Sequence, residues 1–378
     1  MNYLLASDSN VERAGVCIFM LDWIRGIRNI DKNGTIIVYF RKGILSKEIA
    51  SMYSELDAKI VCGNLPQNAS NLSLENRRII KKDIKGLFHS YKFDVIHVNS
   101  SAMGFSSMLL SEAKKEHIPV RIAHSHGRNL GNGWKNIYLW FLRMKIYLNA
   151  TKYAGCSVDA GEYLFGKKVL SSKRWYFIPN TVSVEKYKFN LSKREEYRNK
   201  LKVDRDTILL GATGMLDSRK NHIFLVPLIK RLKDRNISVK LVVLGEGNQR
   251  NEIEELCRKL HIEEYVCLLG TSNCVSEWLS AMDVYVMPSK TEGLPIGAVE
   301  AQANGLYCIM SNGVPRDVDI SDRVFHLSIN NGVDEWADLI CNLPSMDEKE
   351  RLEGQTILKE AGFDSSSITK YISNLYGV

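Results

Sequence analysis

The sequence predicts an α/β protein made of two halves, each a doubly wound parallel β-sheet with helices on both faces. A chain of 378 residues is too long for one ordinary core and suits two domains of about 180 residues each. Short apolar runs alternate with longer amphipathic stretches almost from end to end. Apolar runs bracketed by helices are typical of buried parallel strands, and this pattern occurs in both halves.

Five short apolar runs in the first half are predicted to be strands. They are Tyr3–Ser7, Thr35–Phe40, Val95–Val98, Val120–His124 and Trp175–Ile178. Between them, apolar residues three and four positions apart predict helices over Val16–Asn29, Leu74–Tyr91 and Ser107–His117. We therefore expect an N-terminal domain over residues 1–180.

The second half repeats this alternation. Its predicted strands are Thr207–Thr213, Val239–Leu244, Val266–Leu269, Val284–Met287 and Tyr307–Met310. The preceding stretch is highly charged and offers little that can pack a core, so residues 181–205 are predicted to be a linker and residues 206–362 a C-terminal domain. Gly362 separates a final predicted helix within residues 363–378.

Charge is unevenly divided between the halves. Residues 1–180 carry 26 Lys and Arg against 14 Asp and Glu, whereas residues 181–378 carry 25 against 29. The basic half is expected either to meet an anionic membrane surface or phospholipid-linked acceptor, or simply to be solvated. Because no aromatic and basic residues interleave in a nucleic-acid-binding motif, no nucleic-acid partner is expected.

The aromatic segment 134–150 bears on the same question. It is strongly apolar but is interrupted by Lys135, Arg143 and Lys145. Such a segment can lie in a membrane interface with its cations at the lipid headgroups, or it can form a buried or inter-domain helix. Since the sequence has no secretory leader and no apolar stretch of about 20 residues, we expect a cytoplasmic protein, with association to the inner face of the cell membrane as an open alternative.

The most informative motif occupies residues 288–305 and follows the predicted strand Val284–Met287. Pro295 and the small residues after it are compatible with a helix start, where free amides and the helix dipole favour a diphosphate. Glu292 and Glu300, eight residues apart, are expected on one side of this element, where their carboxylates can accept hydrogen bonds from sugar and ribose hydroxyls.

This motif resembles the E-x7-E region of the retaining GT-B glycosyltransferases of family 4, in the branch that builds capsular and exopolysaccharides. The resemblance implies two Rossmann-like domains facing across a cleft, with the final helix crossing back to the N-terminal domain. It also implies that Glu292 contacts the donor sugar, Glu300 the nucleotide ribose, and the amides around Leu294–Gly297 the diphosphate. The implied donor-binding residues in this stretch are Glu292, Gly293, Leu294, Pro295, Ile296 and Glu300.

Two further turns in the second half match the same family. Gly214, Arg219 and Lys220 follow the strand Thr207–Thr213, and their backbone and cations are expected to approach the diphosphate. Lys220 matches the family lysine, but Met215 stands where the family has an arginine, so Arg219 is the candidate to replace it. Gly245 follows the strand Val239–Leu244 in a Gly-x-Gly turn that is also assigned to the donor site.

In the first half, the resemblance points to the segment that ends the strand Val120–His124. It implies that His126 faces the donor sugar, where it could donate a hydrogen bond, with Arg128 nearby on the acceptor side. Gly15 resembles the family's acceptor loop. Histidines at positions i and i+2 can also ligate a metal, but no carboxylate or cysteine set completes such a site in the sequence, so no metal is expected.

The implied chemistry is transfer of a hexosyl or N-acetylhexosaminyl group from a nucleotide-diphosphate sugar to a glycan or polyprenyl-diphosphate-linked acceptor. Glu292, His126 and Lys220 are the expected catalytic residues, and no cofactor or divalent metal is expected. Two alternatives stay open: a nucleotide-sugar-binding assembly module without turnover, and a GT-B nucleotide-sugar epimerase.

Overall fold

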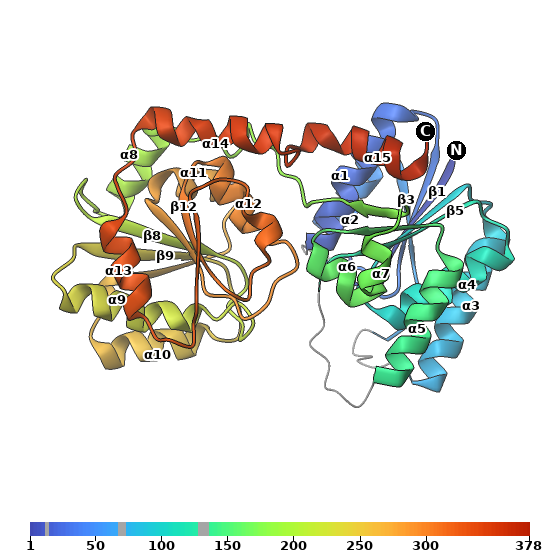
Figure 1. Cartoon of the computed structure of the whole chain (residues 1–378), viewed down its shortest axis with the longest axis horizontal. Helices are drawn as coiled ribbons and strands as arrows, with labels where there is room; N and C mark the ends of the chain where they lie inside the picture. The colour runs from blue at the N-terminus through green and yellow to red at the C-terminus, as the bar shows by residue number, and fades with distance from the viewer. Residues whose placement is uncertain (12–14, 67–72, 128–135) are drawn as a thin grey trace. The chain divides into compact units, whose positions relative to one another are not determined.

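The computed structural model describes residues 1–11, 15–66, 73–127 and 136–378. The chain divides into two compact units (Figure 1). Unit 1 comprises Met1–Asn180 together with Ser366–Val378, and unit 2 comprises Thr181–Ser365. The final helix, which the resemblance implied would cross back to the N-terminal domain, therefore belongs to unit 1.

Unit 1 contains a seven-stranded sheet in the order β3-β2-β1-β4-β5-β6-β7, and its paired strands are all parallel. The strands are β1 Asn2–Ser7, β2 Thr35–Phe40, β3 Ala58–Cys62, β4 Val95–Asn99, β5 Val120–Ser125, β6 Lys152–Gly155 and β7 Trp175–Phe177.

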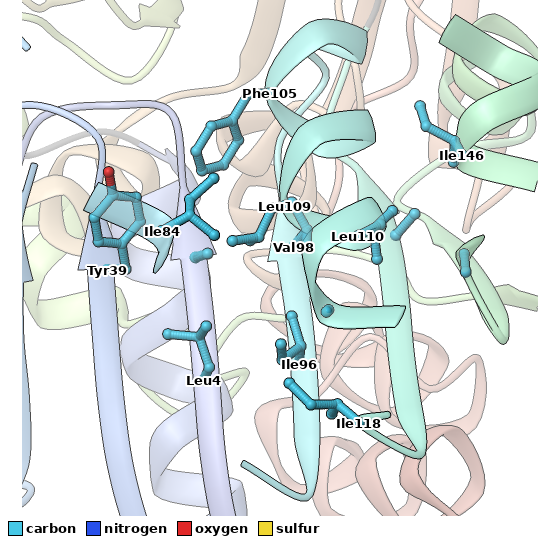
Figure 2. Close-up of a cluster of buried hydrophobic side chains, with 14 of the residues drawn as sticks. Leu4, Tyr39, Ile84, Ile96, Val98, Phe105, Leu109, Leu110, Ile118 and Ile146 are labelled. Atoms are coloured by element: carbon cyan, nitrogen blue, oxygen red, sulfur yellow. The ribbon is translucent and has the colours of Figure 1, made fainter. Parts of the chain in front are cut away.

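Helices cover both faces of this sheet. They are α1 Gly15–Ile30, α2 Lys47–Glu55, α3 Leu74–Ser90, α4 Met103–Lys115, α5 Asn136–Asn149, α6 Val158–Phe165, α7 Lys167–Leu170 and α15 Ile368–Tyr376. Along β1, Leu4 and Ala6 enter one apolar cluster with α3, α4 and α5, while Tyr3 and Leu5 enter another with α1, α2 and α15. The alternation follows from the two-residue period of a strand. Figure 2 shows the first cluster, in which α4 contributes Phe105, Leu109 and Leu110.

The last helix of the chain packs beside the first. α15 lies along α1 (Figure 1), and Ile368 and Ile372 fill the space left by Gly26 of α1, where a Cβ atom would lie 2.6 Å from both side chains. The smallest residue type thus allows the two helices to approach closely, which ties the end of the chain to its beginning.

Unit 2 contains a six-stranded sheet in the order β10-β9-β8-β11-β12-β13, again with parallel pairs. The strands are β8 Ile208–Thr213, β9 Val239–Leu244, β10 Val266–Gly270, β11 Val284–Met287, β12 Tyr307–Ser311 and β13 Val324–Leu327. The helices are α8 Leu191–Lys200, α9 Leu225–Asp234, α10 Arg250–Leu260, α11 Val275–Ala281, α12 Ile296–Ala303, α13 Asp334–Asn342 and α14 Glu348–Glu360.

The predicted fold class is confirmed: both units are parallel-sheet α/β domains. The segment 181–205, expected to be a linker, instead lies within unit 2 and contains α8. Its polar sequence packs because Arg194 and Arg198 form ion pairs with Asp283 at 2.5 and 2.8 Å, and Arg198 donates further hydrogen bonds to backbone carbonyls. In the described part of the chain, no helix has both the length and the apolar character that crossing a bilayer requires.

Candidate functional site

The candidate donor site lies at the point where the strand order of unit 2 reverses. β8 and β11 are neighbours in the sheet, and the chain continues outward from β8 through β9 on one side and from β11 through β12 on the other. In open α/β sheets, ligands bind outside the carboxyl ends of the strands at such a switch point. The loops after β8 and β11 carry most of the residues that the sequence singled out.

The loop after β8 is shaped by Asp217. Its Oδ1 accepts hydrogen bonds from the amides of Arg219 at 3.1 Å and Lys220 at 2.8 Å, which closes a tight turn. Asn221 ends the turn in the left-handed conformation, with φ 58°. Gly214 has φ 123°, and a Cβ atom there would lie 3.2 Å from Lys220 Cε, so this position leaves room for the lysine stem.

The loop after β11 brings Glu292 to these two cations. Arg219 Nη1 donates to Glu292 Oε2 at 2.9 Å, and Lys220 Nζ forms an ion pair with Glu292 Oε1 at 2.7 Å. The Glu292 and Lys220 side chains are 6% and 14% exposed, whereas Arg219 is 44% exposed. Three residues predicted from two separate motifs therefore meet: Glu292 is buried, Lys220 is partly buried and Arg219 is exposed.

Helix α12 begins beside this group. Pro295 is its N-cap residue, with φ −73°, and the first helical residue is Ile296. Gly297 lies against the end of β8, since a Cβ atom there would lie 2.4 Å from Thr213 Oγ1 and 2.7 Å from Tyr285 Oη. The helix start and its dipole are thus packed onto the strand that leads into the Gly214 turn, where they favour an anion.

Glu300 lies farther along α12 and has different partners. Burial raises the pKa of its carboxyl, while a hydrogen bond from the Tyr187 hydroxyl and the charge of Lys186 lower it. Burial also raises the pKa of Tyr285, and the charges of Glu300 and Glu292 raise it further. The negative charges of Glu300 and Glu292 therefore both act on the Tyr285 hydroxyl. Among the described residues, no direct contact joins the two carboxylates.

The backbone conformation and the close packing at position 245 require glycine. Its φ is 154°, and a Cβ atom would lie 1.9 Å from the carbonyl oxygen of Gly214. The two turns are also joined by hydrogen bonds, from Gly214 N to Leu244 O at 2.9 Å and from Leu216 N to Glu246 O at 2.9 Å. Glycine at position 245, which the sequence assigned to the donor site, therefore also allows two backbone turns to approach closely.

Several buried polar atoms around these loops lack a hydrogen-bond partner among the described residues. They are His222 Nδ1, Gln249 Oε1, Ser289 Oγ and Glu292 Oε1, the last contacted only by the Lys220 ion pair. Buried polar atoms are nearly always paired, so a group of unpaired ones indicates a place where a polar ligand or water binds. Burial, followed by the charge of Lys220, lowers the pKa of His222 to about 4, so its ring is neutral here.

At the corresponding edge of unit 1, the His126 ring packs between two elements. Its Nε2 lies 2.9 Å from Asn99 Oδ1 at the end of β4, and its ring packs edge-on against Phe19 of α1, with centroids 4.7 Å apart. Gly15 is the first residue of α1, one turn before Phe19. Arg128, the other predicted acceptor-side residue, lies outside the described residues.

A buried network continues from His126 to the end of the chain. The His126 ring stacks on His124 with centroids 4.1 Å apart, and His124 Nδ1 lies 3.0 Å from His97 Nε2. His97 Nδ1 lies 3.1 Å from the Tyr376 hydroxyl, which accepts a hydrogen bond from Trp23 Nε1 at 2.8 Å. Burial lowers the pKa of His97 and His124 well below the ordinary value and that of His126 to about 3. All three rings are therefore neutral.

The hydrogen bonds also assign the His126 tautomer. Asn99 Nδ2 donates to His97 O at 3.2 Å, so Asn99 presents its Oδ1 acceptor to His126. His126 must then carry its proton on Nε2 and leave Nδ1 as a hydrogen-bond acceptor. We expected His126 to donate to a sugar hydroxyl. The network instead suits it to accept a hydrogen bond from one.

Some residues of these sites carry no signal in the sequence. Tyr187 lies in the stretch that was expected to be a linker, and Tyr376 is separated from His97 by 279 positions. Ser289 lies within the motif over residues 288–305, but no pattern in the sequence singled it out. No local pattern predicts such contacts, because each depends on how distant elements pack.

Comparisons with known proteins identify the family of this chain. Residues 193–351 match the family model of glycosyl transferases group 1. The chain is 32% identical to EpsF of Bacillus subtilis, a protein named as a glycosyltransferase, over 291 residues that cover 76% of this chain and 75% of the relative. It is 25% identical, over 72% of both chains, to the Escherichia coli UDP-Gal:α-D-GlcNAc-diphosphoundecaprenol α-1,3-galactosyltransferase.

Among solved structures, Anabaena HepE in complex with UDP is similar over the full length of both chains. The TM-score is 0.79 at 15% sequence identity, a likeness that concerns the fold.

Proposed function

Since this chain belongs to the group 1 glycosyl transferases and is a glycosyltransferase, we propose that it moves a hexosyl or N-acetylhexosaminyl group from a nucleotide-diphosphate sugar to a lipid-linked glycan, with retention of configuration. The observation that carries this proposal is the contact of Glu292 with both Arg219 and Lys220 at the carboxyl edge of the second sheet. We place the reaction in the synthesis of a cell-surface polysaccharide (capsule or exopolysaccharide), on the cytoplasmic side of the membrane.

The donor diphosphate would replace Glu292 as the binding partner of Arg219 and Lys220. Arg219 and Lys220 are paired to one carboxylate, and a diphosphate offers them a larger negative charge beside the start of α12. The exposed Arg219 guanidinium has the freedom to turn toward it. In this proposal Arg219 supplies the positive charge that the family arginine provides. Met215, which stands at the family position and is 60% exposed, has no charge to offer.

The carboxylates would then bind the two sugars of the donor. Glu292, released from its cations, accepts hydrogen bonds from hydroxyls of the transferred sugar, and Glu300 accepts them from the ribose. The raised pKa of Glu300 and its contact with Tyr187 support a buried, partly desolvated binding position. Gly293 and Leu294 join Glu292 to Pro295 at the helix start and would approach the diphosphate through their backbone.

The transfer itself needs no nucleophile from the protein. The bond between the anomeric carbon and the diphosphate oxygen breaks, the acceptor hydroxyl oxygen attacks from the same face, and its proton passes to the departing phosphate. Arg219 and Lys220 would stabilise the charge on the leaving group, so no divalent metal is required. The neutral His126, whose Nδ1 is a hydrogen-bond acceptor, would orient a hydroxyl of the sugar or of the acceptor.

The nature of the substrates is supported by the relatives. The Escherichia coli relative uses UDP-Gal and a diphosphoundecaprenol-linked acceptor, and HepE is bound to UDP. By analogy we propose a UDP-sugar donor and a polyprenyl-diphosphate-linked acceptor for this chain. The basic character of residues 1–180 suits an acceptor that carries phosphates at an anionic membrane surface.

A transfer assay with two glutamate variants tests this function. The purified chain is given UDP-sugars and a polyprenyl-diphosphate-linked sugar, and the product is followed by mass spectrometry. Glu292→Gln should abolish measurable transfer. Glu353→Gln should not change it, because Glu353 is likewise paired to an arginine, Arg323 at 2.8 Å, but lies outside the candidate site.

The alternatives predict other outcomes. Donor binding by thermal shift without any turnover would favour the assembly module. Interconversion of free nucleotide sugars without an acceptor would favour the epimerase. Equal transfer by Glu292→Gln and the wild type would contradict the proposal.

A further inference from the structure

Helix α5 carries large apolar side chains on two opposite sides, one of which faces solvent. Leu142 and Ile146 are buried in the unit 1 core, and Figure 2 shows Ile146 at one end of that cluster. On the opposite side, Trp140 and Phe141 are 55% and 54% exposed. A surface helix ordinarily carries polar residues on the side opposite the core, so the apolar outer side of α5 indicates a partner.

We define the α5 outer face as its exposed apolar side chains between positions 140 and 148. These are Trp140, Phe141, Met144, Tyr147 and Leu148. At 100° per residue they fall within about one third of the helix circumference, opposite Leu142 and Ile146. Together with Tyr138 they account for 6 of the 16 large apolar side chains exposed in the described residues, so the exposure is concentrated rather than scattered.

Lysines lie in a groove to one side of this face. Lys81, Lys115 and Lys145 line a groove of about 210 Å³ formed by α3, α4 and α5. Glu112, the acidic residue of the lining, is nearly buried and is paired to Lys115 at 2.8 Å, with Lys81 at 4.0 Å. The groove therefore presents a net positive charge beside an apolar helix face.

The sequence suggested Arg143 as a cation at the lipid headgroups, but its guanidinium binds a carbonyl group of unit 1. Arg143 donates from Nε and Nη2 to the carbonyl oxygen of Tyr163 at 3.1 and 2.6 Å, which ties α5 to α6. Its charge is thus partly directed into unit 1. Lys145, which is exposed and lines the groove, remains beside the α5 outer face.

We propose that the α5 outer face lies in the interface of an anionic phospholipid bilayer, with Lys81, Lys115 and Lys145 at the lipid headgroups. Exposed tryptophan and phenylalanine favour the headgroup boundary, and lysines beside them are attracted to anionic lipid. The charge of the groove favours a membrane over a second copy of this chain, which would bring the same lysines together. The inference deepens the proposed function, because a polyprenyl-linked acceptor is confined to a membrane.

Vesicle binding without donor or acceptor tests this surface independently of the enzyme reaction. The full chain is sedimented with vesicles of phosphatidylcholine, with and without phosphatidylglycerol. The wild type should bind the anionic vesicles, and added salt should weaken its binding. Trp140→Ala/Phe141→Ala should weaken it more than tenfold. Its control, Leu191→Ala/Leu269→Ala, also removes two exposed apolar side chains and should bind like the wild type.

A charge variant provides the second arm. Lys81→Gln/Lys145→Gln removes two cations but leaves Lys115 on Glu112, so the fold is retained. At about 1 kcal/mol for each lysine, its binding to anionic vesicles should fall roughly 30-fold. The control Lys259→Gln/Lys349→Gln removes two exposed lysines of unit 2 and should bind normally.

The outcomes separate the possible failures. Normal vesicle binding by both α5 and charge variants would overturn the proposal. So would a wild type that ignores vesicles but forms dimers that Trp140→Ala/Phe141→Ala dissociates, since the face would then be an interface between copies. Lost vesicle binding with unchanged transfer to a water-soluble acceptor would support the surface. Absence of any transfer by a wild type that binds vesicles would count against the proposed function alone.

Discussion

Lys220 Nζ lies 2.7 Å from Glu292 Oε1, and Arg219 donates to the other oxygen of the same carboxylate at 2.9 Å. At the switch point of unit 2 the two cations thus share the Glu292 carboxylate, and Arg219 also lies 3.9 Å from Asp217 Oδ2. In the proposed function, donor binding exchanges partners: the cations move to the diphosphate, and the carboxylate moves to the sugar. Each member of the group therefore has a separate, measurable role.

Removal of the lysine should weaken donor binding. A hydrogen bond between charged groups contributes about 1.5–3 kcal/mol, so Lys220→Gln should raise the donor Kd by about 10- to 150-fold. Isothermal titration with a UDP-sugar measures this change. Lys259→Gln, an exposed lysine on α10, should leave the Kd unchanged. A Kd for Lys220→Gln equal to that of the wild type would exclude the lysine from the diphosphate site.

The role of Arg219 can be tested by moving the charge. Arg219→Ala should raise the donor Kd at least tenfold, because it removes one of the two cations on Glu292. Adding Met215→Arg restores an arginine at the family position, and Met215 is exposed enough to accept it. The double variant should therefore recover most of the affinity. If Arg219→Ala binds donor normally, another group holds the diphosphate.

Gly245 should be required for stability. Alanine there would place its Cβ atom 1.9 Å from Gly214 O, in a backbone conformation with φ 154°. We expect Gly245→Ala to lower the unfolding free energy by at least about 2 kcal/mol in urea denaturation. Gly86→Ala is the matched control: it lies in α3 with open space around its Cβ position, and should stabilise the fold by about 0.5–1 kcal/mol. Equal effects of the two changes would refute the account of the paired turns.

Unit 1 should lose stability as the pH falls. His97 and His124 are fully buried, and burial lowers their pKa well below 6.5. The unfolded chain takes up protons near pH 6.5 that the folded chain does not, so the stability is present above that pH and is lost below it. Between pH 7.5 and 5.5, each histidine should lower the unfolding free energy by about 1.4 kcal/mol.

Urea midpoints measured across this range give the number of protons bound on unfolding. His124→Asn, whatever its stability at neutral pH, should reduce that number by one. If the pH dependence of the urea midpoint is the same in this variant as in the wild type, the His124 ring has the same pKa in the folded and unfolded chain. That result would contradict the prediction.

The sequence predicts the fold well where strands are buried on both faces. β1, β2, β8, β9 and β11 are largely apolar, since helices cover both sides of each sheet. β3 and β13 were missed because they are partly exposed edge strands that lack such a run. β6 was missed because its sequence, which begins with Lys152 and ends with Gly155, is not an apolar run. α8 was missed because its arginines find their partners on other elements.

In the candidate site, too, residues in local motifs could be predicted and residues that depend on distant partners could not. Glu292, Arg219 and Lys220 were predicted because each lies in a local motif after a strand, and the parallel sheet brings such ends together. The contact of Tyr187 with Glu300 and the chain of rings from Tyr376 to His126 depend on packing between distant segments. Periodicity carries no information about such pairs, whereas the folded structure gives them directly.

A donor-bound crystal structure tests the central claim most directly. The account predicts that Arg219 and Lys220 leave Glu292 and contact diphosphate oxygens beside the start of α12, while Glu292 accepts a hydrogen bond from a hydroxyl of the transferred sugar. A donor bound elsewhere, with both cations still on Glu292, would contradict it.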